Sequence, residues 1–260
     1  MSDGITVVLV LVAGFFTGVL SGTFGVGGAV ISTPAILALG ATNLEAVGST
    51  LPSIIPSSIS GSLRYRRGGF IHRRVALITG LAGGTSAAIG AVASDAFPGQ
   101  GHVQMILTAA LMGFTAYRTA LIAAPAPDAG ATRELRTTVP LLVAIGFAAG
   151  LLSGFLGVGG GILMVPAFTG LVGLDLKRAI ATSLVCVGII SVPGTIAHQL
   201  LGNVNWFYAL PLMIGAIPGA RVGAHLAIRA SDRHLRIAVA SVLGTIAVIY
   251  GTVELVLLFN

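Results

Sequence analysis

Long apolar segments joined by short loops make up nearly all of this 260-residue chain. Ten such segments can be distinguished, at residues 5–23, 29–41, 45–63, 72–94, 102–122, 138–155, 161–174, 178–200, 206–228 and 234–258. A helix needs about 20 apolar residues to cross a bilayer, and most of the segments are long enough. Only 8% of the residues are charged, whereas soluble domains have about 25%. The sequence therefore predicts an all-α polytopic membrane protein, because a helix satisfies its own backbone in lipid.

Two of the segments, 29–41 and 161–174, are too short to span a bilayer at 1.5 Å per residue. Each follows a glycine-rich string. We therefore expect residues 5–41 and residues 138–174 each to form a broken helix or a re-entrant hairpin rather than one long span.

The chain contains an internal repeat. Gly14-Phe-Phe-Thr-Gly-Val-Leu-Ser-Gly22 resembles Gly146-Phe-Ala-Ala-Gly-Leu-Leu-Ser-Gly154, and the string Gly-Val-Gly-Gly follows both copies at the same spacing. Further on, Ala-x-x-Ser-Thr-Leu at 46–51 corresponds to Ala-x-x-Thr-Ser-Leu at 179–184. These matches predict a first transmembrane repeat at 1–122, a Pro/Ala/Gly-rich cytoplasmic linker at 123–137 and a second transmembrane repeat at 138–260.

Basic residues gather in four places along the chain. Of the 14 Lys and Arg residues, only Arg221 lies elsewhere; the others are Arg64, Arg66, Arg67, Arg73 and Arg74, then Arg118, Arg133 and Arg136, then Lys177 and Arg178, and finally Arg229, Arg233 and Arg236. Loops 42–45, 95–101 and 198–205 carry no Lys or Arg. Cytoplasmic loops are enriched in Lys and Arg, which predicts that both termini lie outside.

This charge pattern predicts that the two halves have opposite orientations. The basic loop at 64–74 would be inside, whereas the equivalent loop of the second half, 198–205, would be outside. Inverted repeats are typical of secondary transporters, whose substrate site lies near the bilayer midplane at the interface of the repeats.

The glycine strings are the best candidates for such a site. Glycine lets the backbone turn tightly and approach a ligand closely, and the helix that follows begins with unpaired N–H groups that favour an anion. The candidate substrate-binding residues are Gly25, Gly27, Gly28, Gly157, Gly159 and Gly160. The alternative is that these glycines only allow close helix packing. A dinucleotide-binding fingerprint would need a preceding strand, which the pattern does not predict.

Hydroxyl side chains occupy equivalent positions in both halves and could donate to an anion without placing charge in lipid. The candidates are Ser49, Thr50, Thr182 and Ser183, together with Ser21 and Ser153 just before the glycine strings. The alternative is a hydrogen bond to another helix or to the backbone of the same helix, which is common for Ser and Thr in membrane helices.

Arg221 lies inside the ninth apolar segment and could counter the charge of a substrate anion. Alternatively, its long side chain could snorkel to the cytoplasmic interface. His225 lies one helical turn further on the same face, and His198 ends a helix on the predicted outer side, where it could act in gating or proton coupling.

Other functions lack the residues that they need. No cluster of His, Cys, Asp and Glu has metal-ligand spacing, and no nucleophile–base constellation is visible, so we expect no metal, no cofactor and no enzyme activity. Cys186 is the only cysteine, which excludes a disulfide framework. The expected partners are a small anionic substrate and membrane lipid, and not nucleic acid.

The doubled motif Gly-x-x-Ser-Gly-x-x-Gly-Val-Gly-Gly, followed by a proline, resembles that of the sulfite exporter TauE/SafE family of membrane transporters. It stands here at 18–34 and 150–166, and the stretch Gly-Asn-Val-Asn-Trp at 202–206 is also similar to that family. The resemblance implies transport of a small sulfur-containing anion, such as sulfite or a sulfonate, or of an organic acid. Ala29, where the second copy has a third glycine, is a departure from the motif.

We therefore expect a secondary transporter of a small anion that works by alternating access. We expect it in the cell membrane, as a multi-pass protein of a prokaryotic inner membrane. An anion channel or a transporter of small carboxylates is the alternative, and a membrane scaffold without transport is a further one.

Overall fold

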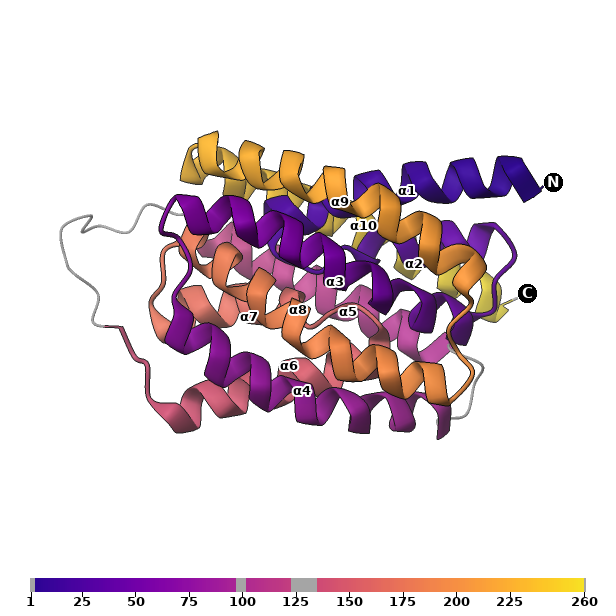
Figure 1. The fold of residues 1–260 in the computed structure, drawn as a ribbon, viewed down its shortest axis with the longest axis horizontal. Helices are drawn as coiled ribbons and strands as arrows, with labels where there is room; N and C mark the ends of the chain where they lie inside the picture. The colour runs from indigo at the N-terminus through magenta and orange to yellow at the C-terminus, as the bar shows by residue number, and fades with distance from the viewer. Residues whose placement is uncertain (1–2, 97–101, 123–134, 260) are drawn as a thin grey trace.

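The computed structural model describes residues 3–96, 102–122 and 135–259, and within these ranges it contains helices and no strand (Figure 1). The helices are α1 (Asp3–Phe24), α2 (Ala29–Ala38), α3 (Asn43–Arg67), α4 (Arg73–Ala96), α5 (His102–Ile122), α6 (Val139–Leu156), α7 (Gly161–Ala167), the π-helical turn η1 (Phe168–Val172), α8 (Leu176–Leu200), α9 (Trp206–Arg229) and α10 (Asp232–Phe259). Five of them, α1, α4, α6, α8 and α9, are long and apolar enough to cross a membrane. The prediction of an all-α polytopic membrane protein is confirmed.

Both predicted breaks occur at the glycine strings. Helix α1 ends at Phe24 and α2 begins at Ala29, while α6 ends at Leu156 and α7 begins at Gly161. The short helices end sooner than the apolar pattern suggests. In the first half, a capping box of Thr42 and Glu45 starts α3 four residues after α2 has ended.

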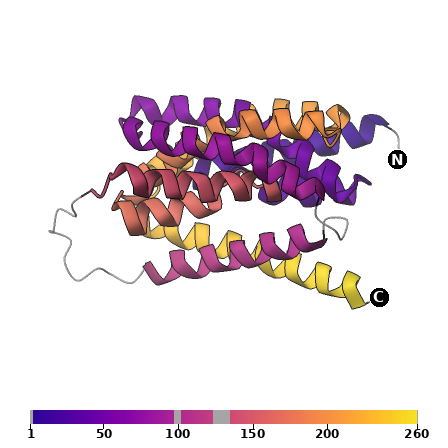
Figure 2. The ribbon, with the colours of Figure 1, turned by 90° about the horizontal axis from the view of Figure 1, so that it is seen from below.

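The two halves are interlaced rather than side by side. Helix α1 of the first half packs along α9 of the second, and the equivalent helix α6 packs along α4. Likewise α3 packs on α9 and α8 on α4, while α3 contacts α8 and α5 contacts α10 across the centre. Figure 2 shows α5 and α10 side by side as a separate layer below the rest of the bundle. Each of these contacts thus has a counterpart when the halves are exchanged.

Small residues allow these helices to approach closely. In the α1–α9 pair, Gly14, Gly18 and Gly22 face the backbone of Leu212, Ala216 and Ala220. The α4–α6 pair repeats this arrangement with Gly146, Gly150 and Gly154, which face Thr79, Gly83 and Ala87. Glycines spaced by four residues are a common basis of helix association in membranes.

Helix α3 and its equivalent α8 run in opposite directions in Figure 1. The connection from α3 to α4 lies at the left end in Figure 1, whereas that from α8 to α9 lies at the right end. The α7–α8 and α9–α10 connections also reach the left end, so the basic loops gather at one end of the molecule. The orientation in a membrane and the boundaries 1–122, 123–137 and 138–260 stay predictions; residues 123–134 of the linker, including Arg133, lie outside the described residues.

Topology reporters should give opposite results at the two ends. Alkaline phosphatase fused after Gly202 or after Asn260 should be active, because both positions are predicted to be outside. Green fluorescent protein fused after Arg229 should fluoresce, because the α9–α10 connection is predicted to be inside. Fluorescence of a fusion at Asn260 would contradict the inverted orientation.

Candidate functional site

All six candidate glycines adopt a left-handed backbone conformation. Their φ angles lie between 67° and 87°, at Gly25, Gly27, Gly28, Gly157, Gly159 and Gly160. L-residues with a side chain rarely adopt this conformation, because the Cβ atom crowds the carbonyl oxygen. The strings therefore need glycine at these positions for reasons beyond helix packing.

The two glycine strings meet in the interior. A methyl group built on Gly27 would lie 3.3 Å from the Cα atom of Gly159, and one on Gly159 would lie 3.3 Å from the Cα atom of Gly27. Cγ1 of Val187 borders both positions, at 3.1 and 3.0 Å from these methyl groups. Residues 25–28 and 157–160 are buried, so two segments 132 residues apart form one enclosed backbone region.

Backbone donors in this region have no protein acceptor. Within the described part of the chain, the N–H groups of residues 26–28 donate no hydrogen bond to another protein group, and neither do those of residues 158–160. Gly28 also precedes α2 as its N-cap, without a side-chain cap. Successive N–H groups beside left-handed residues form a concave nest that binds anions. Buried N–H groups are nearly always paired, so these unpaired donors are the feature of the strings that calls for an acceptor.

Ser21 and Ser153 lie one helical turn before the strings, and their carbonyl oxygens accept the N–H groups of Gly25 and Gly157 at 2.8 and 2.9 Å. Both are buried, with 0% and 1% of their surface exposed, and their hydroxyls have no partner in the described structure. A methyl on Gly28 would lie 3.3 Å from Cβ of Ser21. Thr17, one turn before Ser21, also has a buried, unpartnered hydroxyl and contacts the same position on Gly28. The four-residue spacing from Ser21 is the signal by which Thr17, absent from the predicted set, could have been found.

Thr50 and Ser183 hold the strings across the two halves. The Thr50 hydroxyl, in α3, donates to the Gly157 carbonyl oxygen at 3.2 Å, and the Ser183 hydroxyl, in α8, donates to that of Gly25 at 2.9 Å. Each hydroxyl also lies within hydrogen-bond distance of a carbonyl of its own helix. A hydroxyl has one proton, so each of these side chains shares its donor between a string and its own helix: the Val47 carbonyl, at 2.9 Å, is the nearer acceptor for Thr50, and the Gly25 carbonyl is the nearer acceptor for Ser183.

Ser49 and Thr182 act on the next connection instead. The Ser49 hydroxyl oxygen accepts the N–H of Asn205 at 2.8 Å, and that of Thr182 accepts the N–H of His72 at 3.1 Å. Asn205 and His72 directly precede α9 and α4, so each hydroxyl fixes the start of a helix from the other half. The predicted alternative, hydrogen bonding to the backbone, describes all four of these hydroxyls in this structure.

Arg221 and the two histidines lie away from the contacts of the strings. Nε of Arg221 donates to the Ser60 hydroxyl at 3.1 Å, in a groove between α3 and α9. Nδ1 of His225, one turn on, accepts from Arg64 in the same groove. His198 is fully buried, and its Nε2 donates to the Gly154 carbonyl at 2.8 Å.

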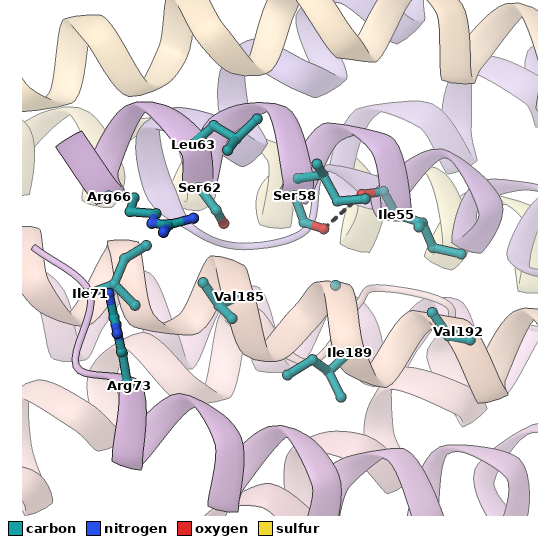
Figure 3. Close-up of a pocket in the computed structure, with 12 residues that line it drawn as sticks. Ile55, Ser58, Ser62, Leu63, Arg66, Ile71, Arg73, Val185, Ile189 and Val192 are labelled. Carbon is teal, nitrogen blue, oxygen red and sulfur yellow. Dashed lines mark hydrogen bonds between the residues drawn. The ribbon is translucent and has the colours of Figure 1, made fainter.

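A cleft of about 650 Å³ is lined mainly by residues of the central helices α3 and α8 (Figure 3). Figure 3 shows Ser58 and Ser62 pointing into it from α3, and Val185, Ile189 and Val192 from α8. Arg66 and Arg73 lie together at one end. Other faces of the same helices contact the strings, because Ile54 and Val187 border Gly159. The side chains of Ile54 and Val187 thus cover the strings where α3 and α8 pass.

Comparison with known proteins identifies relatives over nearly the whole chain. The family model described as sulfite exporter TauE/SafE matches residues 10–250. The chain is 29% identical over 237 residues to the "Probable membrane transporter protein YunE" of Bacillus subtilis, which covers 84% of this chain and 87% of that protein. A "Probable membrane transporter protein" of Xylella fastidiosa is 28% identical over 234 residues, or 88% of each chain. No solved structure gives a significant match.

Proposed function

Since the chain belongs to the sulfite exporter TauE/SafE family of membrane transporters, we propose that it carries a small oxyanion through a site formed by the two glycine strings. The observation that carries this proposal is the meeting of two sets of buried, unpartnered N–H groups, at residues 26–28 and 158–160. The hydroxyls of Ser21 and Ser153 add one donor from each half.

Neutral donors suit a site that must release its substrate. Backbone N–H groups and hydroxyls bind an anion by oriented dipoles, and no charged side chain has to be buried in the bilayer. A fixed guanidinium would bind more tightly, because charge-assisted hydrogen bonds are roughly twice as strong. The proposed site can therefore bind an anion from one side of the membrane and release it on the other.

A sulfur oxyanion fits the number and arrangement of the donors. Sulfite and a sulfonate group each present three acceptor oxygens, and a carboxylate presents two. With a nest on each side, three oxygens can accept from both halves at once, which favours the sulfur-containing anion over a small carboxylate. The description of the family also refers to sulfite.

The bonds between the halves suit transport by alternating access. Thr50 ties α3 to the string of the second half, and Ser183 ties α8 to the string of the first. A rocking motion of α3 against α8 would therefore move both nests together. The α3–α8 cleft, with Arg66 and Arg73 at one end, is the proposed cytoplasmic approach to the site. An anion channel is the alternative, and counterflow in proteoliposomes would favour the carrier.

A thermal-shift screen tests the substrate class directly, because a ligand that binds the folded state raises its apparent stability. The purified protein is heated with sulfite, sulfate, thiosulfate, short sulfonates or small carboxylates, and we expect the largest shift with a sulfur oxyanion. Changing both Ser21→Ala and Ser153→Ala should weaken binding by about tenfold to a hundredfold, the equivalent of two hydrogen bonds of about 1 kcal/mol each.

The matched control for this screen is the double variant Ser57→Ala and Ser191→Ala. These hydroxyls are also buried, but they donate to carbonyls of their own helices. The control should keep the anion-dependent shift. The proposed site would be refuted if the Ser21/Ser153 variant showed the same anion-dependent shift as the unchanged protein. It would also be refuted if none of the anions shifted the unchanged protein.

A further inference from the structure

A second group of anion-attracting side chains lies in the groove between α3 and α9. The groove has a volume of about 480 Å³ and is lined by Ser60, Leu63, Arg64, Arg67, Arg221, Val222, His225 and Leu226. Spacings of three and four residues place the polar members on one face of each helix, at 60, 64 and 67 on α3 and at 221 and 225 on α9. Three guanidinium groups therefore share one groove.

Nothing in the groove neutralises this charge. Its lining contains no carboxylate, and neither ion pair observed in the described part of the chain, Lys177–Asp232 and Arg178–Asp175, involves a groove residue. Arg64, Arg67 and Arg221 thus bring three positive charges to the edge of an apolar bundle. Charged groups at such positions are normally paired.

The hydrogen bonds within the groove leave donors free for a ligand. A guanidinium can only donate, so Nδ1 of His225 accepts from Nη2 of Arg64, at 2.7 Å, and the neutral imidazole carries its proton on Nε2. The Nε–H of Arg221 donates to the Ser60 hydroxyl, which in turn donates to the Ile217 carbonyl at 2.8 Å. Among the residues that the structure describes, neither Nη group of Arg221 has a hydrogen-bond acceptor.

The pseudo-symmetry of the fold shows that packing does not require these side chains. In the equivalent α8–α4 groove, the positions of Ser60, Arg64 and Arg67 are occupied by Pro193, Ala197 and Leu200, and those of Arg221 and His225 by Ala88 and Val92. The same two helices meet there without a charged or hydrogen-bonding side chain at any of the five positions. The basic groove is therefore a feature of one half only, at the end of the molecule where the basic loops gather.

We propose that the α3–α9 groove binds a tetrahedral oxyanion, a phosphate or sulfonate group, through Arg64, Arg67 and Arg221. Arginine suits this ligand because its planar fork pairs two N–H groups with two oxygens. The anion comes either from a lipid headgroup or from solution. Arg221 lies eight residues before the end of α9, about 12 Å along the helix, so its side chain reaches the level of lipid phosphates by extending toward the helix end.

The test measures two probes on the same proteins. In the first arm, thermal shift is recorded with inorganic phosphate in detergent. In the second, retention of phosphatidylglycerol is measured by native mass spectrometry after transfer from nanodiscs of phosphatidylcholine and phosphatidylglycerol. Changing Arg64→Gln and Arg221→Gln keeps hydrogen-bond donors but removes two charges. It should weaken binding of the relevant probe at least tenfold to a hundredfold, as expected for lost charge-assisted bonds.

The matched control, Arg74→Gln with Arg233→Gln, also removes two positive charges, but from positions outside the groove at this end of the molecule. It should bind both probes as the unchanged protein does. Loss in the phosphate arm alone assigns the groove to a soluble anion, and loss in the lipid arm assigns it to a headgroup. If the Arg64/Arg221 variant does not fold, Arg67→Gln, at an exposed position, replaces it with an expected loss of about tenfold.

The central site is distinguished by the Ser21→Ala, Ser153→Ala variant. A phosphate shift that this variant keeps, and that the Arg64/Arg221 variant loses, locates phosphate in the groove. The reverse pattern would place phosphate at the glycine strings. That pattern, or equal binding of both probes by all the proteins, would overturn the groove proposal without affecting the transport proposal.

Discussion

Replacing Gly27 by alanine should reduce transport at least a hundredfold while the protein still inserts into the membrane. The left-handed backbone at this position, with φ of 87°, costs about 1–2 kcal/mol for a residue with a side chain. The new methyl would also lie 3.0 Å from the Val158 carbonyl oxygen and point toward Gly159. It would force the strings apart, and a displacement of about 1 Å in a binding site can reduce a rate by two orders of magnitude.

The measurement is anion flux into proteoliposomes, with Gly40→Ala as the matched control. Gly40 has φ of 98°, so alanine meets a similar backbone penalty there, but no atom lies within 4 Å of the added methyl. The Gly40 variant should transport at nearly the normal rate. Normal flux through the Gly27 variant would show that the strings only pack helices.

Replacing Gly18 by leucine should leave no folded protein. Even a methyl group at this position would overlap the Ala216 carbonyl oxygen. It would also lie 2.8 Å from both the Ala216 Cα atom and the Ala220 nitrogen. Because these are backbone atoms, α1 and α9 would have to separate. Inserting extra carbons into a packed core costs about 1–3 kcal/mol and sometimes more, and separation also removes contacts along the helix pair. A typical domain is stable by only about 5–15 kcal/mol, so the overpacking cost and the lost helix contacts together can exceed what the fold tolerates.

Size-exclusion chromatography of detergent extracts would reveal this loss as aggregated or degraded protein. Gly113→Ala is the control, because its added methyl would meet only the Cβ atom of Ala247, at an ordinary 3.8 Å. That variant should elute as a single peak, and alanine favours the helix by up to about 1 kcal/mol. A folded Gly18→Leu protein would contradict the close α1–α9 packing.

The sequence was sufficient to predict the helices and the two breaks, because each depends on local composition and spacing. It identified Thr50 and Ser183 as equivalent positions but not their partners. Those partners are Gly157 and Gly25 of the opposite half, so the bonds depend on which helix packs against which string. Tertiary contacts of this kind leave no periodic signal in the chain.

Arg221 illustrates a second limit. Its position within an apolar segment marks it as unusual, but helical phase decides which neighbour it faces. The backbone of the adjacent Ala220 lies against Gly18 and Gly22 of α1, whereas the Arg221 side chain faces Ser60 of α3. A shift of one residue along a helix turns a side chain by about 100°, which is enough to move it from one interface to another.

The interlacing of the halves also governs how the protein can be made. A ribosome completes α1 some 200 residues before it completes α9, the helix along which α1 packs. Until then the glycine face of α1 has no protein neighbour, and the first string lacks the Ser183 hydroxyl that holds it. The first half therefore cannot mature as it leaves the insertion machinery. Its contacts with α8, α9 and α10 can form only after those helices of the second half have been made.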